Sequence, residues 1–177
     1  AQIALFSRNS TDGIDWTRSS EAEKWTTQNF NQIKMQGIDA SFEMDFTAKY
    51  NEAVLFRRFT AGYTFIDAQV SDQVAFSKYT LNHLRHQVVA SVEHRIFRGI
   101  VHSARVRWCD RQTNTSTVKG DYWVADSRIS WKYRNWKVYA EATNVFNTVY
   151  GEIRYSDTTV LTMPGRWFRA GFTVQIL

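Results

Sequence analysis

Apolar and polar residues alternate with a period of two along most of the chain, and helical periodicity is weak almost everywhere. The C-terminal residues show the alternation most clearly. Their apolar face comprises Phe168, Ala170, Phe172, Val174 and Ile176, and the opposite face comprises Arg169, Gly171, Thr173 and Gln175. This pattern predicts a strand with one side in an apolar medium and the other in a polar one.

Eight stretches carry the pattern and are predicted to be strands. Their approximate limits are 3–16, 25–46, 55–69, 85–97, 100–111, 122–133, 136–146 and 167–177. Tight turns at 98–99 and 134–135, and a turn at 47–53, alternate with longer polar loops. Membrane β-barrels have short turns on one side and long loops on the other. We therefore expect an all-β fold of antiparallel transmembrane barrel strands in an up-and-down meander.

The polar faces of these strands carry many charges. The predicted lumen-facing wall comprises Asp39, Glu43, Arg58, Glu93, Arg105, Arg107, Asp126 and Arg128. Burying so many charges in a dry core would cost several kcal/mol for each unpaired one. The apolar faces are therefore expected to meet lipid, while the charges meet water or a polar plug.

Composition agrees with a barrel wall. Aromatic residues make up 15% of the chain, including 7 Trp and 8 Tyr, and both types favour strands and the membrane–water boundary. No window of 18 apolar residues predicts a transmembrane helix. The net charge of +5 suits an anionic lipid or lipopolysaccharide surface. No nucleic-acid-binding motif occurs, so nucleic acid is not an expected partner.

No catalytic or metal-binding constellation stands out, so neither an enzyme nor a cofactor nor a metal site is expected. The four histidines have no metal-ligand spacing with a neighbouring Cys; they are His83, His86, His94 and His102. Cys109, the single cysteine, excludes an internal disulfide. It is interpreted as a wall residue.

Four segments carry a family resemblance, and their order and spacing span the whole chain. They are IALFSRNSTDGIDW, NFNQIKMQGIDASFEMDF, YAEATNVFNTVYGE and MPGRWFRAGFTVQIL. The third holds Asn144, Val145, Phe146, Asn147 and Tyr150 in an N-L-F-(D/N)-x-x-Y pattern, and the fourth begins the closing strand with Pro164–Gly165–Arg166. On these residues the chain resembles the C-terminal part of TonB-dependent outer-membrane receptors.

The resemblance implies a 22-stranded barrel with a plugged lumen, of which residues 1–177 would be the last eight strands, without the plug domain and the earlier strands. It also implies uptake of a bulky, scarce nutrient of the vitamin B12 (cobalamin) or iron-siderophore type, with energy from TonB through the missing plug. Other implied partners are the lipid and lipopolysaccharide of a Gram-negative outer membrane and a surface lipoprotein. The chain departs from the family in ending on Ile176–Leu177 instead of an aromatic residue.

Ligand contacts are expected in the external loops, because aromatic side chains dominate recognition of bulky ligands. The candidates are Phe76, Tyr79, Tyr122 and Tyr155. Asn144, Pro164, Gly165 and Arg166 are interpreted as fold residues, with Pro164–Gly165 setting a turn.

Two alternatives remain open at this point. Eight strands are enough to close a free-standing outer-membrane barrel, and a soluble β-sandwich or lipocalin-like binding module could show similar alternation. A receptor segment would have a plug and further strands encoded upstream, whereas a soluble module would need no detergent.

Overall fold

The computed structural model describes residues 1–20, 22–47, 55–70, 76–78, 83–112, 120–154 and 160–176. In this part of the chain, no helix is long and apolar enough to cross a membrane.

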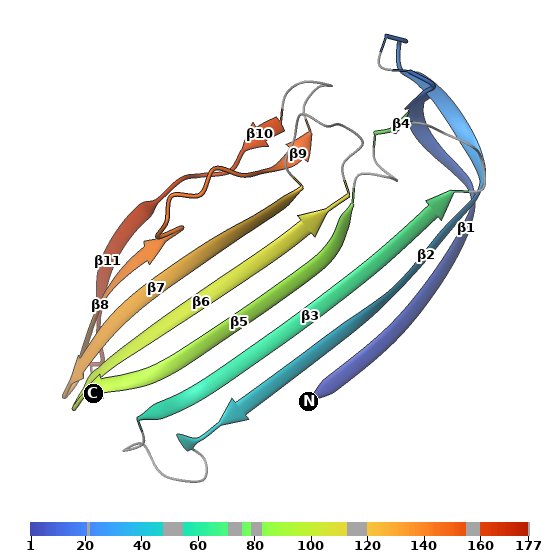
Figure 1. Cartoon of the computed structure of the whole chain (residues 1–177). Coiled ribbons are helices and arrows are strands. Elements are labelled where there is room, and N and C mark those ends of the chain that lie inside the picture. Colours follow the sequence, from blue (N-terminus) through green and yellow to red (C-terminus); the bar gives the residue numbers. More distant parts are fainter. Residues whose placement is uncertain are drawn as a thin grey trace.

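Eight long strands dominate the structure (Figure 1). They are β1 (Gln2–Arg18), β2 (Thr26–Asp45), β3 (Phe56–Val70), β5 (Leu84–Phe97), β6 (Ile100–Arg111), β7 (Asp121–Tyr133), β8 (Trp136–Thr143) and β11 (Trp167–Val174). Three short strands accompany them: β4 (Phe76–Ser77), β9 (Gly151–Arg154) and β10 (Val160–Thr162). The eight predicted strands are thus confirmed. β8 ends at Thr143, earlier than expected, and the loop before β11 contains the short β9–β10 hairpin.

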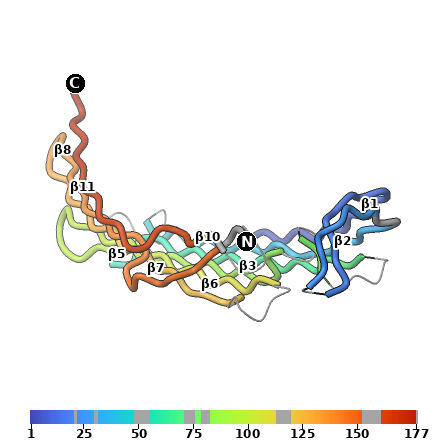
Figure 2. The backbone as a smooth tube through the Cα atoms, turned by 90° about the horizontal axis from the view of Figure 1, so that it is seen from above, coloured from blue at the N-terminus to red at the C-terminus, as the bar shows by residue number. Residues whose placement is uncertain are grey.

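The long strands pair antiparallel with their sequence neighbours, in the order β11-β8-β7-β6-β5-β3-β2-β1-β4. The predicted up-and-down meander is therefore confirmed. The short strand β4 interrupts the simple order, because it follows β3 in the chain but pairs with the outer edge of β1. Among the described residues, no ladder joins β11 to β1 or β4. Figure 2 shows the sheet bent into an open arc, with β1 and β11 toward opposite ends.

One face of the sheet is apolar, and in the described part of the chain no second layer covers it. Cross-strand register brings together Phe42, Ala61, Ala90, Val106 and Ala125 on this face. Its larger side chains are strongly exposed, with Phe168 at 73%, Trp123 at 56% and Val106 at 37%. Among the described residues, the buried hydrophobic cluster is small and comprises Cys109, Tyr122 and Val124, which lie on the opposite face. An apolar surface of this extent marks contact with another protein or with a membrane.

Aromatic residues flank the small side chains of the apolar face at both ends. Near the long loops, Trp108 packs against Trp123 with ring centroids 6.1 Å apart, and the Tyr63 hydroxyl is 2.9 Å from His86 Nδ1. Near the short turns, the rings of Trp136 and Phe172 are 6.1 Å apart. Two aromatic belts around an apolar band are the pattern of an outer-membrane barrel wall.

Candidate functional site: the polar face of the sheet

The opposite face carries a row of charged side chains that runs across seven strands. Direct cross-strand partners build the row in the order Asp45, Arg58, Glu93, Ser103, Arg128, Glu141 and Arg169. Positive and negative residues alternate along it, interrupted only by Ser103. Opposite charges placed directly across a ladder are favourable, so this arrangement supports the observed register.

Ion pairs link most members of the row. Arg58 Nη2 donates to Asp45 Oδ2 at 3.2 Å. At the other end of the row, Glu141 receives two arginines: Arg169 Nη2 at 2.6 Å and Arg128 Nη1 at 3.6 Å. Glu141 on β8 therefore forms ion pairs with both neighbouring strands, β7 and β11.

A β-bulge adds one more arginine to the polar face. The register between β3 and β5 shifts between Phe56 and Arg58, which leaves Arg57 without a direct partner in the ladder. A bulge re-aims the side chain of the extra residue. Arg57 Nε consequently donates to Glu93 Oε1 at 2.9 Å.

All eight residues predicted as a polar wall share this face. Glu43 and Arg105 belong to the row that also contains Thr60, Ser91 and Asp126, and Asp39 lies four residues from Glu43 along β2. Arg107 follows Arg105 on the same face of β6. The pairing establishes one shared polar face; that this face lines a lumen stays a prediction.

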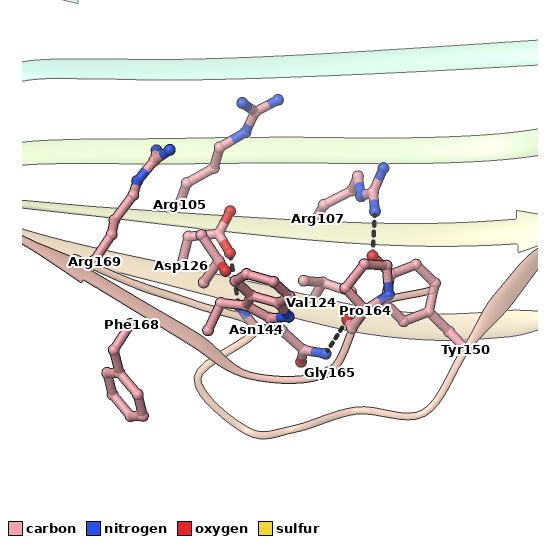
Figure 3. Close-up of a pocket in the computed structure, with 12 residues that line it drawn as sticks. Arg105, Arg107, Val124, Asp126, Asn144, Tyr150, Pro164, Gly165, Phe168 and Arg169 are labelled. Atoms are coloured by element: carbon pink, nitrogen blue, oxygen red, sulfur yellow. Dashed lines mark hydrogen bonds between the residues drawn. The ribbon is translucent and has the colours of Figure 1, made fainter. Parts of the chain in front are cut away.

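A cavity of about 580 Å³ opens on the polar face where β6, β7 and β8 meet the start of β11. In Figure 3, Arg105, Arg107 and Arg169 extend from the sheet on one side, whereas Phe168 points to the other. Asp126 is the direct cross-strand partner of Arg105, but its Oδ1 accepts from the backbone N–H of Asn144 at 2.9 Å. The cavity therefore presents cationic and aromatic groups to any ligand.

A stack of two tyrosines supports one of these arginines. The Tyr122 and Tyr150 rings lie 4.6 Å apart. The Arg107 guanidinium lies 5.8 Å from the Tyr122 ring centroid and 5.7 Å from that of Tyr150. Arg107 Nη2 also donates to the Tyr150 hydroxyl at 3.4 Å. Tyr150 thus fixes the guanidinium at the cavity wall.

The structure describes two of the four aromatic residues that were predicted to contact a ligand from the loops. Tyr122 lies in strand β7, not in a loop, and is buried with 7% of its surface exposed. Its aromatic ring stacks on Tyr150 and lies near the Arg107 guanidinium. Phe76 lies in β4, where the Arg18 guanidinium sits 5.2 Å from its ring centroid. Tyr79 and Tyr155 lie outside the described residues.

Strand β4 is fastened to β1 by a buried polar contact that the sequence pattern did not reveal. Asp15 and Ser77 are 1% and 0% exposed. Ser77 Oγ donates to Asp15 Oδ2 at 2.6 Å, and Lys78 N donates to the Trp16 carbonyl at 3.0 Å. Strand β4 and Lys78 are thereby held against the loop end of β1.

Several other residues of the polar face were missed as site residues: Glu141, Tyr150, Trp167 and Arg169. Signals in the sequence could have found two of them. Arg169 falls on the polar side of the last alternating strand, and Tyr150 completes the N-L-F-type pattern. In the described part of the chain, no group of three or more His, Cys, Asp or Glu residues could hold a metal ion. Cys109 is a buried free thiol.

An antiparallel sheet with one exposed apolar face, aromatic belts and one charged face is the wall of a membrane β-barrel. Residues 1–145 match the family described as "TonB dependent receptor-like, beta-barrel", and the chain belongs to that family.

A solved structure shares this fold. It is the closed form of Fiu, the ferric-catecholate import receptor of E. coli K12, with a TM-score of 0.68 and 18% sequence identity. The match covers 97% of this chain and 24% of the Fiu chain, so this chain spans about a quarter of that receptor's length. No curated protein matches the sequence.

Proposed function

We propose that this chain is part of the barrel wall of an outer-membrane receptor that imports a bulky, scarce nutrient with energy from TonB. The observation that carries the proposal is the two-faced sheet of a TonB-dependent receptor family member, with an exposed apolar side and a charged side. Vitamin B12 and iron-siderophore complexes are the nutrient classes we propose. The ferric-catecholate import of the structurally similar Fiu favours the second.

The apolar face is proposed to contact lipid, with the lipopolysaccharide leaflet on the long-loop side. The spacing of the aromatic belts supports the contact with lipid. On β6, Ile100 pairs with Trp131 near the short turns, and Trp108 pairs with Trp123 near the long loops. These two positions are separated by about 27 Å along the strand at roughly 3.4 Å per residue. At a strand tilt of about 40°, that distance spans roughly 20 Å of membrane, close to the apolar band of about 25 Å in such barrels.

The polar face is proposed to line the lumen. A cavity lined by Arg105, Arg107 and Arg169 opens on this face, and we propose that a ligand entering from the long-loop side passes these residues. Phe76 in β4, together with Tyr79 and Tyr155, is proposed to contact the ligand on the long-loop side. A surface lipoprotein is proposed as a further partner. Tyr122 is proposed to act indirectly, by supporting Arg107.

The chain is proposed to be the last eight strands of a 22-stranded barrel, whose plug domain and earlier strands lie elsewhere in the full protein. Two observations support this arrangement: the match covers 24% of Fiu, and the described part of the sheet is not closed by a ladder between β11 and β1. TonB would then act through the plug.

Two measurements test the proposal. Outer membranes are extracted with detergent, and the intact mass of the native protein is determined; a mass several-fold above 20.7 kDa is expected. Uptake of radioactive ferric siderophores and cobalamin is then compared in cells with and without the gene, in tonB-positive and tonB-negative backgrounds. TonB-dependent uptake of one nutrient supports the proposal. A native mass of 20.7 kDa, or a protein found in the soluble fraction, would contradict it.

A further inference from the structure

Two histidines lie side by side on the apolar face, toward the end of the sheet that carries the short turns. His94 on β5 and His102 on β6 are direct cross-strand partners. Their ring centroids are 4.9 Å apart, the ring planes are inclined by 68°, and both residues are half-buried. Because the tight turn at Arg98–Gly99 joins their strands, the hairpin itself holds the two imidazoles together.

The surroundings of this histidine pair are apolar. The next cross-strand pair on the same face is Val92 with Ala104, and in the neighbouring ladder His102 is paired with Ile129. Ionisable side chains in a membrane-spanning segment are costly, and they commonly mark a functional site. Apolar residues would serve contact with lipid better, so two adjacent imidazoles at this place indicate a function beyond that contact.

The hydrogen bonding of the pair leaves ring nitrogens available. His102 Nε2 lies 2.9 Å from Ser127 Oγ. A histidine that binds a metal usually donates its second ring N–H to a nearby acceptor, which fixes the tautomer. With Ser127 as the acceptor, Nδ1 of His102 keeps its lone pair. The His94 ring contacts the rings of Phe56 and His102, and none of the described residues forms a hydrogen bond with its nitrogens.

The separation of the rings suits one shared metal ion. Zinc binds imidazole nitrogen at about 2.0–2.1 Å in tetrahedral geometry, which places the centroids of two ligating rings about 5 Å apart. The observed distance between the His94 and His102 centroids is 4.9 Å. Binding therefore requires rotation of the rings about their side-chain torsions, without a change in the separation of the strands.

We propose that His94 and His102 bind one divalent transition-metal ion of the zinc or copper class, for which neutral imidazole is a preferred ligand. No group of three or more His, Cys, Asp or Glu residues occurs in the described part of the chain. Oxygen atoms of water or lipid phosphate therefore complete the coordination, and the ion exchanges readily.

The depth of the site in the membrane gives access to such oxygen atoms. His102 is two residues from Ile100, whose partner Trp131 belongs to the aromatic belt near the short turns. Two residues span about 7 Å along a strand, or about 5 Å of depth at a tilt of about 40°. This estimate rests on the proposed contact of the apolar face with lipid. It places the ion at the boundary between headgroups and acyl chains.

The test is Cu²⁺ binding to the full-length protein, purified in detergent and stripped of metal with a chelator. Electron paramagnetic resonance identifies the nitrogen ligands of the bound ion. The affinity for one equivalent, bound through two nitrogens, should fall at least tenfold in His94→Gln and in His102→Gln. His86→Gln is the matched control, because it removes an imidazole that stacks near Trp108 in the other aromatic belt. A loss in one of the two variants alone, or an equal loss in His86→Gln, would overturn the proposal.

A second measurement needs no substitution and therefore holds even if a variant misfolds. Diethyl pyrocarbonate modifies neutral imidazole nitrogens, and mass spectrometry reports the extent of modification at each histidine. Saturating Zn²⁺ should slow the modification of both His94 and His102 at least fivefold and leave that of His86 unchanged. Equal rates with and without Zn²⁺, or protection of one histidine of the pair alone, would contradict a shared ion. Neither measurement depends on nutrient uptake, so failure of the metal site and failure of the proposed function are distinguishable.

Discussion

The side-chain amide of Asn144 makes two hydrogen bonds with the backbone of Thr148: Asn144 Nδ2 donates to the Thr148 carbonyl at 2.9 Å, and Thr148 N donates to Asn144 Oδ1 at 2.8 Å. Asn144 is 3% exposed and has a φ of 49°, a left-handed conformation that Asn tolerates better than most residues. These hydrogen bonds hold the chain in its turn after β8, and Asn144 is one of the residues that line the cavity.

Substitution Asn144→Ala should destabilise the protein by about 2–4 kcal/mol, because buried backbone groups lose their partners and Ala is strained at positive φ. Urea unfolding of the full-length protein in phospholipid vesicles, followed by tryptophan fluorescence, measures the change. Asn9→Ala is the matched control, since Asn9 is exposed on β1, and should shift stability by less than about 0.5 kcal/mol. Equal effects of the two substitutions would contradict the structural role of Asn144.

Gly99→Ala should weaken the turn between β5 and β6. Gly99 has a φ of 77°, and a Cβ atom there would lie 2.7 Å from the Lys132 carbonyl oxygen. The expected loss is at least about 1–2 kcal/mol, the cost of the left-handed region for a non-glycine residue. Gly62→Ala is the matched control, because its nearest neighbour would lie 3.8 Å away. The same unfolding measurement separates them, and a neutral Gly99→Ala would show that the turn has another conformation.

Adjacent residues on β6 provide a test of the two faces. Ala104 lies on the apolar face beside Val92 and Ser127, whereas Ser103 lies on the polar face between Glu93 and Arg128. If the apolar face meets lipid, Ala104→Arg should cost about 2–4 kcal/mol in a lipid bilayer, with the larger value near the membrane centre. Ser103→Arg should be tolerated. The folded fraction in vesicles at increasing urea measures both, and the reverse ranking would invert the assignment of faces.

Ser77→Ala should release β4 from the edge of β1. The substitution removes the hydrogen bond to buried Asp15, which leaves a carboxylate oxygen without this donor and costs about 1–3 kcal/mol locally. Hydrogen exchange of the Lys78 amide, which donates to the Trp16 carbonyl, should become at least about fivefold faster. Ser7→Ala, at an exposed position of β1, should leave that exchange rate unchanged. Unaltered protection of Lys78 in Ser77→Ala would show that Phe76 and the backbone hold β4 by themselves.

The sequence by itself determined the strands and their two faces. Side chains alternate sides in a strand whatever it pairs with, so the period-two pattern places Arg105 and Arg107 on one side and Val106 and Trp108 on the other before any partner is known. The tight turns at Arg98–Gly99 and Arg134–Asn135 can likewise be predicted from neighbouring residues in the sequence, without knowledge of distant contacts. They join neighbouring strands and therefore predict the meander.

Only the tertiary structure decided which residues meet. Glu141 receives both Arg128 and Arg169 because of the register between β7, β8 and β11, and alternation is the same in every register shifted by two residues. Asp15 and Ser77 are 62 positions apart, and their contact requires β4, which follows β3 in the chain, to pair with the far edge of β1. Tyr122 becomes a buried support for Arg107 because Tyr150, beyond the end of β8, folds back over it. Such contacts depend on how the chain returns upon itself, which a pattern of apolar and polar residues along the chain does not specify.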